Sequence, residues 1–135
     1  MFGLGAYRRW LRSDRVRLGR WGERRARAFL RRRGYRIIAR NWRCPAGEVD
    51  LVAADPSGSI AFVEVKTRRD EHWAPGQQAV HERKQQHLAR VAQWFARRYG
   101  LKDRSLRFDV IVVVVPETGR VEVRHYVNAF TRPGR

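Results

Sequence analysis

Two short apolar stretches, GEVDLVA (47–53) and IAFVEVKTR (60–68), hold the charged residues around which the rest of this chain can be arranged. Each is long enough for one strand, and side chains alternate between the two faces of a strand. Alternation places Glu64 with Lys66 on one face of the second strand. By the same rule Glu48 and Asp50 share a face of the first. A buried cluster of three carboxylates and one amine is costly unless a metal ion or a phosphate balances it, so we interpret it as a functional site.

The structural alternative is an ordinary ion pair on a solvated sheet face, because a Glu-x-Lys spacing alone is very common. The apolar surroundings favour a site, and alternation also predicts that Val49 and Leu51 lie on the face opposite Asp50. Lysine usage adds weight. Of 30 Lys and Arg residues, only Lys66, Lys84 and Lys102 are lysines. Lysine differs from arginine because its pKa can fall on burial, although chance is an alternative explanation with so few to place.

Composition limits the class of protein. A chain of 135 residues, 43% of them hydrophobic, suits one globular domain. The net charge of +17 opposes folding through self-repulsion, and it indicates a polyanionic partner, most commonly nucleic acid. A ribosome-like structural binder would be equally basic, and an acidic membrane surface is a weaker third option.

Several other classes of site are excluded or disfavoured by the sequence. The single cysteine, Cys44, cannot form an internal disulfide or a cysteine-rich zinc site, and the four histidines lack metal-ligand spacing. The longest apolar run, 110–115, is too short for a membrane span. Because nothing resembles a signal peptide, we expect a cytoplasmic protein that does not bind membrane.

Periodicity predicts the order helix, strand, strand, strand, helix, strand, strand. We expect an α/β fold with a central mixed five-stranded sheet flanked by helices, formed by a single domain over residues 16–131. Residues 1–15 are basic and read as a flexible N-terminal arm that contacts phosphates or as a disordered segment, with a targeting segment as a further alternative. The expected helices and strands are 16–33, 35–42, 48–53, 60–67, 77–99, 107–115 and 120–127.

The clustered acids suit metal-assisted phosphodiester hydrolysis. Asp50 and Glu64, with the carbonyl of Val65, can supply the hard oxygen ligands that Mg²⁺ prefers. Lys66 can orient or deprotonate a water molecule, or stabilise the charge that develops on phosphorus. Glu23, on the arginine-rich first helix, is either a further acid of this site or the partner of a neighbouring arginine at helical spacing.

A family resemblance follows from longer strings. LGRWGERRARAFLRRRGYRIIARNWRCPAGEVDLVA (18–53), FVEVKTR (62–68), RFDV (107–110) and VNAF (127–130) resemble the YraN family of bacterial proteins. Those proteins are predicted endonucleases, similar to archaeal Holliday junction resolvases and to the restriction-endonuclease-like PD-(D/E)xK superfamily. The match covers nearly the whole chain. It departs from the superfamily name at Val49, where the name has proline.

The resemblance implies a restriction-endonuclease-like core and a nuclease that requires Mg²⁺ or Mn²⁺. It implies catalytic positions at Glu23, Asp50, Glu64 and Lys66, and metal ligands at Asp50 and Glu64, with Glu48 a less defined member of the set. The candidate nucleic-acid contacts are basic or aromatic residues of the first helix, the loop after the third strand and the second helix. They are Arg24, Arg68, Arg69, Trp73 and Lys84.

Two hypotheses follow. The first is a metal-dependent DNA endonuclease, with branched DNA as a candidate substrate and a homodimer as an arrangement that would suit a four-way junction. The second is a DNA- or RNA-binding module that keeps the nuclease fold without cleaving. The basic charge supports both equally. The acids favour the first, because a pure binder gains nothing by directing Asp50 and Glu64 at phosphate.

Overall fold

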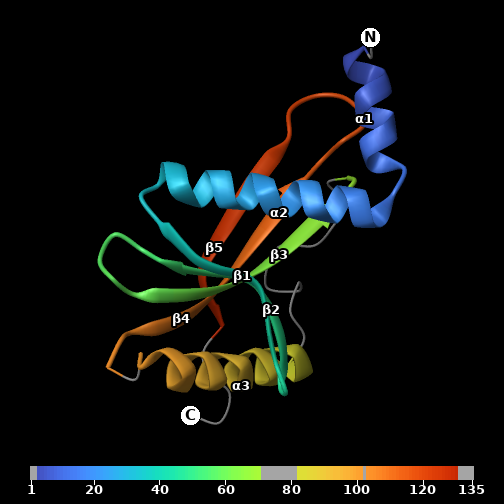
Figure 1. Ribbon diagram of the computed structural model, residues 1–135. Helices are drawn as coiled ribbons and strands as arrows, with labels where there is room; N and C mark the ends of the chain where they lie inside the picture. The colour runs from blue at the N-terminus through green and yellow to red at the C-terminus, as the bar shows by residue number, and fades with distance from the viewer. Residues whose placement is uncertain (1–2, 71–81, 102, 131–135) are drawn as a thin grey trace.

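The computed structural model describes residues 3–70, 82–101 and 103–130, which form a mixed five-stranded sheet with helices on both faces (Figure 1). The strands lie in the order β1-β2-β3-β4-β5, and only β3 and β4 are parallel. The chain between these two crosses the sheet through α3. In chain order the elements are α1 (Leu4–Arg12), α2 (Arg15–Arg32), β1 (Arg36–Cys44), β2 (Gly47–Ala54), β3 (Ile60–Arg68), α3 (Glu82–Tyr99), β4 (Leu106–Val114) and β5 (Glu122–Phe130). The α/β fold expected from the sequence is confirmed.

The segment before α2 differs from the expected arm, because Leu4–Arg12 forms a helix that packs on the domain. Leu11 is only 1% exposed and joins the core beneath α2. The guanidinium of Arg12 donates to the carbonyl of Val115 at 3.1 Å, which ties α1 to the end of β4. The segment is strongly amphipathic, but sequence alone does not tell whether such a basic segment packs on its own domain or contacts a partner.

The two faces of the sheet have separate cores. One core lies beneath α1 and α2 and includes Leu30 and Val63, while the other lies beneath α3 and includes Phe62 and Phe95. Their separation follows from strand alternation, since neighbouring residues of β3 supply opposite cores. Within the described residues no helix is both long and apolar enough to cross a membrane.

The β1–β2 hairpin changes face near Asp50. Leu51 joins the core beneath α2, whereas Val49 joins the core beneath α3, so strict alternation fails between them. On the neighbouring strand Asn41 has a positive φ of 50°, a backbone conformation that Asn adopts more readily than most residues. The expectation that Val49 and Leu51 share a face is therefore wrong, because the backbone twists at this point.

Contact between α2 and β3 depends on a glycine. A Cβ atom added to Gly22 would lie 1.9 Å from Oγ1 of Thr67, so no larger residue fits without movement. The helix can therefore approach the strand closely at this level. Because Glu23 follows Gly22 directly, this contact also fixes the position of Glu23 beside the end of β3.

Candidate active site

The site lies where β2 separates from β3. The antiparallel pairing of these strands ends at Leu51 with Val63, and β3 continues beside β4 to Arg68. Beyond the last pair, the backbone N–H of Val65 donates to Oδ2 of Asp50 at 2.8 Å. The Asp50 side chain thus takes the place of the next strand hydrogen bond, and among the described residues no strand pairs with this side of β3 beyond that point.

Glu64 is the most buried acid of this site, with 6% of its side chain exposed. Nζ of Lys66 lies 3.1 Å from Oε1 of Glu64, and Nζ of Lys84 forms an ion pair with the same oxygen. Lys84 reaches it because it extends the inward stripe of α3, one turn before the buried Leu88. The structure therefore brings together groups from β2, β3 and α3 that the sequence analysis selected separately.

Burial and repulsion shape the charges of the site. Burial, and then the negative charge of Glu64, raise the pKa of Asp50 to about 7, although the hydrogen bond from Val65 opposes the shift. Burial lowers the pKa of Lys66 more than its contact with Glu64 raises it. Burial also favours neutral Lys84, but the contact with Glu64 outweighs it and the pKa is raised. The carboxylates therefore repel each other even with two amines present.

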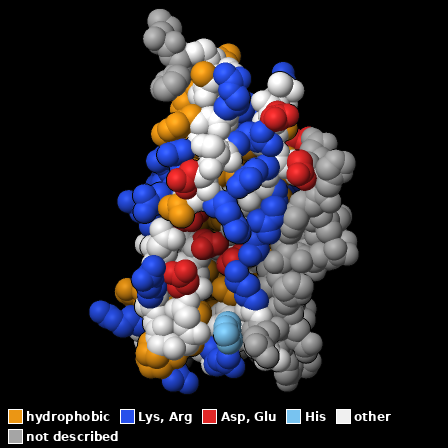
Figure 2. Space-filling view, turned by 90° about the vertical axis from the view of Figure 1, so that its right-hand side faces the viewer, with side chains coloured by type: hydrophobic (Ala, Val, Ile, Leu, Met, Phe, Trp, Pro, Cys, Tyr) orange, Lys and Arg blue, Asp and Glu red, His pale blue; other side chains and the backbone are white. Residues whose placement is uncertain are grey.

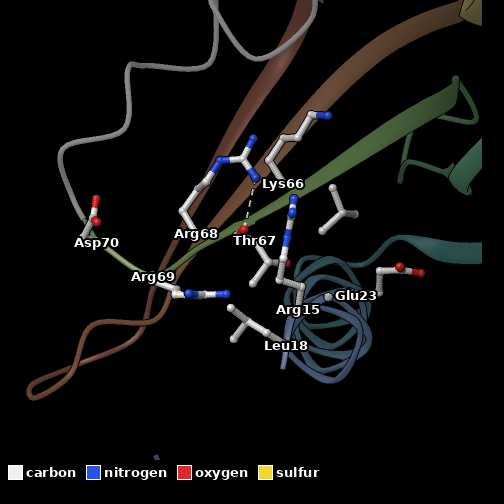
Figure 3. A pocket seen from close by; sticks show the side chains of 10 residues that line it. Arg15, Leu18, Glu23, Lys66, Thr67, Arg68, Arg69 and Asp70 are labelled. Carbon is white, nitrogen blue, oxygen red and sulfur yellow. Dashed lines mark hydrogen bonds between the residues drawn. The ribbon is translucent and has the colours of Figure 1, made fainter. Parts of the chain in front are cut away.

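Glu23 approaches the same group of acids from α2. Burial raises the pKa of its carboxyl; a hydrogen bond from Asn41 opposes this shift, and the charges of Glu48 and Glu64 add to it. Glu23 also lines a pocket together with Lys66 (Figure 3). The sequence left Glu23 as either a further acid of this site or the partner of an arginine on its own helix. Its position beside the site fits the former.

Glu48 is directed differently from its neighbour Asp50. Its carboxylate receives Nε of Arg43 at 3.0 Å, and 53% of the side chain is exposed. Across the described ranges, no three His, Cys, Asp or Glu side chains gather closely enough to form a ready metal site. A cation at this site would accordingly rely on Asp50 and Glu64, completed by backbone oxygen or water.

The candidate nucleic-acid contacts, apart from Lys84 on Glu64, are placed as follows. Arg68 and Arg69 line the pocket beside Lys66, Arg24 is exposed on α2, and Trp73 lies outside the described residues. Figure 2 shows acidic side chains on this face of the molecule with Lys and Arg side chains gathered around them. The pocket also contains Arg15, which sequence reasoning missed because nothing distinguishes it from the other arginines.

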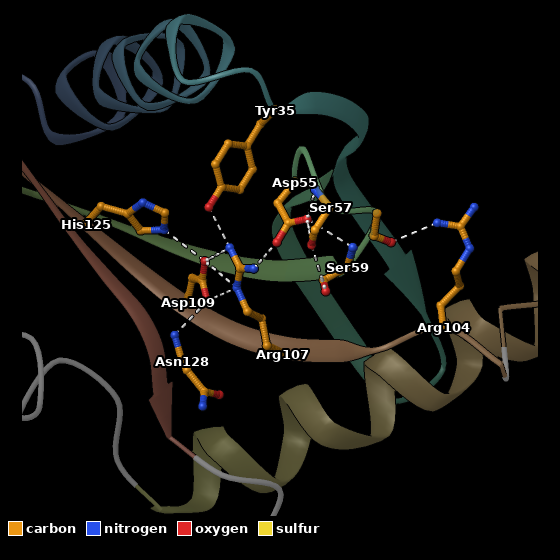
Figure 4. A network of polar contacts seen from close by, with 10 residues as sticks. Tyr35, Asp55, Ser57, Ser59, Arg104, Arg107, Asp109, His125 and Asn128 are labelled. Carbon is orange, nitrogen blue, oxygen red and sulfur yellow. Dashed lines mark hydrogen bonds and ion pairs between the residues drawn. The ribbon is translucent and has the colours of Figure 1, made fainter.

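A second polar cluster lies elsewhere on the sheet and accounts for the RFDV and VNAF strings (Figure 4). Asp109, almost fully buried, is bound by Nε of Arg107 at 3.1 Å, by Nε2 of His125 at 2.8 Å and by the backbone N–H of Asn128 at 2.9 Å. Arg107 also forms an ion pair with Asp55. These mutual contacts, which join β4 to β5 and to the turn before β3, are those of a structural cluster.

Comparison with known proteins gives one family. The profile described as "Uncharacterised protein family UPF0102" matches residues 22–113. A "UPF0102 protein" of Pelobacter propionicus is 45% identical over 120 residues, covering 88% of this chain and 86% of the relative. "UPF0102 protein STH1475" of Symbiobacterium thermophilum is 46% identical over 114 residues, covering 84% of this chain and 96% of the relative.

Two solved structures share part of the fold at low similarity. One is described as "Structure of EndoMS-dsDNA2 complex", with a TM-score of 0.37 and 19% identity over 62% of this chain and 32% of that chain. The other is described as "The structure of Pyrococcus Furiosus SfsA in complex with Ca2+", with a TM-score of 0.34 and 15% identity over 84% of this chain and 62% of that chain. At these TM-scores neither similarity informs the chemistry of the site.

Proposed function

The chain belongs to the UPF0102 family, which confirms the relationship expected from its sequence, and from this premise we propose that it is a metal-dependent DNA endonuclease. The observation that carries the proposal is the convergence of Asp50 and Glu64 where β2 leaves β3, with the amine of Lys66 on Glu64. A module that only bound DNA would be weakened by carboxylates directed at phosphate. Their placement inside a basic face is explained if a cation lies between them and the substrate.

The residues present fit Mg²⁺ or Mn²⁺. Carboxylate oxygens are the donors these ions prefer, and Asp50 and Glu64 would hold the ion. Burial, and then the charge of Glu64, raise the pKa of Asp50, and a bound cation would favour its ionised form. When bound, the ion would polarise the phosphate and lower the pKa of a coordinated water molecule.

The protein groups have distinct roles in this proposal. Lys66 is 17% exposed and lies beside Glu64, and in this proposal its ammonium would stabilise the negative charge that develops on the phosphate during attack. Glu23 borders the same space and would orient the attacking water through its carboxylate. Arginines around the site would bind the flanking phosphates and supply the salt-dependent part of the affinity.

Cleavage assays test the proposal directly. Purified protein is incubated with linear, nicked and four-way-junction DNA in Mn²⁺ or in EDTA, beside Asp50→Asn and Lys66→Ala. We expect metal-dependent cleavage that falls at least about 100-fold in both variants. Asp103→Asn, an exposed carboxylate in the loop after α3, is the matched control and should cleave as the wild type. Cleavage that persists unchanged in both site variants would exclude this assignment.

Branched DNA is the substrate suggested by the sequence resemblance to resolvases, and a homodimer would suit the two-fold symmetry of a four-way junction. Preferential cutting of the junction substrate, with a dimer mass in solution, would support that narrower proposal. The alternative is a non-catalytic nucleic-acid-binding module. Tight binding of all three DNA substrates, with no cleavage in either metal, would favour the module.

A further inference from the structure

We propose that the pocket between the first half of α2 and the end of β3 binds a backbone phosphate of the nucleotide next to the cleavage point. The inference rests on the proposed function, because Lys66 marks the position of the reacting phosphate. It assigns a role to Arg15, which neither the family relationship nor the sequence analysis selects. The ligand class is a phosphate group on a nucleic-acid strand, either internal or terminal.

The pocket is a cavity of about 790 Å³, which lies within the usual range for small-ligand sites. Figure 3 shows Arg15 and Leu18 rising from α2 on one side, with Lys66 and Arg68 on the strand opposite. Among the described residues β2 no longer pairs with β3 here, and the end of β3 lines the cavity. A strand of nucleic acid could enter along this edge without displacing any paired strand.

Charge identifies the ligand. The pocket is lined by four cationic side chains, those of Arg15, Lys66, Arg68 and Arg69, and by the acids Glu23 and Asp70. Burial lowers the pKa of Arg68, and the like charge of Arg15 adds to the effect. Two guanidinium groups held near each other with excess positive charge favour an anion between them. A planar guanidinium binds two oxygens of a phosphate at once. The pocket therefore suits a phosphate group better than an uncharged sugar or base.

Two glycines one turn apart on α2 shape this space in opposite ways. Gly22 lets the helix contact Thr67, whereas a Cβ added to Gly19 would meet no atom within 4 Å. Gly19 therefore faces the cavity and leaves it unfilled. Its position provides a way to block the pocket without altering any charge or any residue of the proposed active site.

The pocket adjoins the proposed active site. Lys66 belongs to both; Arg68 follows it at the end of β3, and Arg69 comes just after the strand. Two strand residues span roughly 7 Å, so Arg68 follows Lys66 at about the spacing of neighbouring phosphates along a strand. The pocket would thus hold the strand in register while the neighbouring phosphate is positioned for attack.

Binding of fluorescent single-stranded oligonucleotides in EDTA tests the inference without requiring cleavage. Gly19→Leu fills the pocket, with Gly19→Ala as its matched control. Arg15→Gln removes one cation, with Arg32→Gln at the far end of α2 as its control. We expect the two pocket variants to bind about three- to tenfold more weakly than their controls. For Arg15→Gln the slope of log K against log salt should become shallower by about 0.7, the value for one phosphate contact on a single strand.

Oligonucleotides with a 5′-phosphate and with a 5′-hydroxyl distinguish the two sources of phosphate. If the ligand is terminal, the wild type prefers the 5′-phosphate and the preference disappears in both pocket variants. If the ligand is an internal phosphate, the pocket variants bind both oligonucleotides more weakly, and by the same factor. Pocket variants that bind as tightly as their controls, with the same salt slope, overturn the inference. Because these measurements omit metal, that result is separate from any failure of the cleavage assay.

Discussion

The carboxylate of Asp50 accepts the backbone N–H of Val65 at 2.8 Å, in the position where β2 would have hydrogen-bonded had it continued beside β3. The acid therefore caps one strand donor and at the same time lies near enough to Glu64 for their charges to interact. A structural contact and a candidate metal ligand are combined in one side chain. Because of this dual role, the ionisation of Asp50 should change the unfolding free energy of the metal-free protein, where it can be measured.

The first prediction concerns pH. The pKa of Asp50 is about 7 in the folded protein and about 4 when unfolded, so the folded state holds its proton more tightly. Its stabilising contribution is complete below about pH 4 and is lost as pH rises towards 7. In EDTA, urea unfolding should show a larger fall in free energy over this range for the wild type than for Asp50→Asn. Parallel curves for the two proteins would contradict the raised pKa.

The second prediction concerns Lys84, which competes with a cation for Glu64. Lys84→Met leaves the nearly buried Glu64 with Lys66 alone, so the metal-free protein should lose about 1–3 kcal/mol of unfolding free energy. Thermal unfolding in EDTA measures this loss. Titration with Mn²⁺ should then raise the Tm of the variant by more than that of the wild type, since one competing ammonium is gone.

Lys102→Met is the control for that experiment, because Lys102 is the third lysine of the chain and is assigned no role in the proposal. It should leave the response to Mn²⁺ at the wild-type level. An equal Mn²⁺ response in Lys84→Met and the wild type would show that Glu64 does not bind the ion.

The third prediction compares the two glycines of α2. Gly22→Ala forces a Cβ against Thr67 and should cost about 1–3 kcal/mol, as overpacking does elsewhere. Gly19→Ala meets no neighbour and should stabilise the helix by up to about 1 kcal/mol. Urea unfolding of the two variants should therefore give changes of opposite sign. Adding Thr67→Ala to Gly22→Ala should recover part of the loss, and no recovery would argue against this contact.

The fourth prediction concerns acid stability. Hydrogen bonds from Ser57, and the ion pair with Arg107, lower the pKa of Asp55 to about 2. Because this value lies below the ordinary one, the carboxylate stabilises the fold fully above about pH 4 and loses that effect as pH falls towards 2. The unfolding free energy of Asp55→Asn should be lower at neutral pH and flatter between pH 4 and 2. Asp103→Asn, an exposed control, should follow the wild-type curve.

Much of this architecture was accessible from sequence because its signals are local. Alternating apolar residues around Glu64 and Lys66 identified β3, and the same pattern identified β2 and the acid within it. The boundaries of β1 to β4 agree with expectation within two residues. The last strand runs to Phe130 rather than 127, through Asn128, whose φ of 54° bends the strand without ending it.

What the sequence could not supply depends on distant contacts. Asn41 adopts positive φ in the middle of a strand, and no neighbouring residue marks that bend. The ion pair of Lys84 with Glu64 exists only because α3 crosses the sheet, which no local pattern in the sequence shows. Arg15 borders the pocket because of the way α2 packs on the sheet. In a chain with so many arginines, nothing in the sequence distinguishes Arg15 from the others.

The two partners of Glu64 also differ in when they can reach it during folding. Lys66 is two positions away, whereas Lys84 arrives only with the crossover that allows β4 to pair in parallel with β3. Hairpin contacts between β2 and β3 are closer in sequence and should form earlier. The acids would then meet before their second ammonium partner, so completion of the crossover would both add β4 to the sheet and relieve the repulsion between the acids.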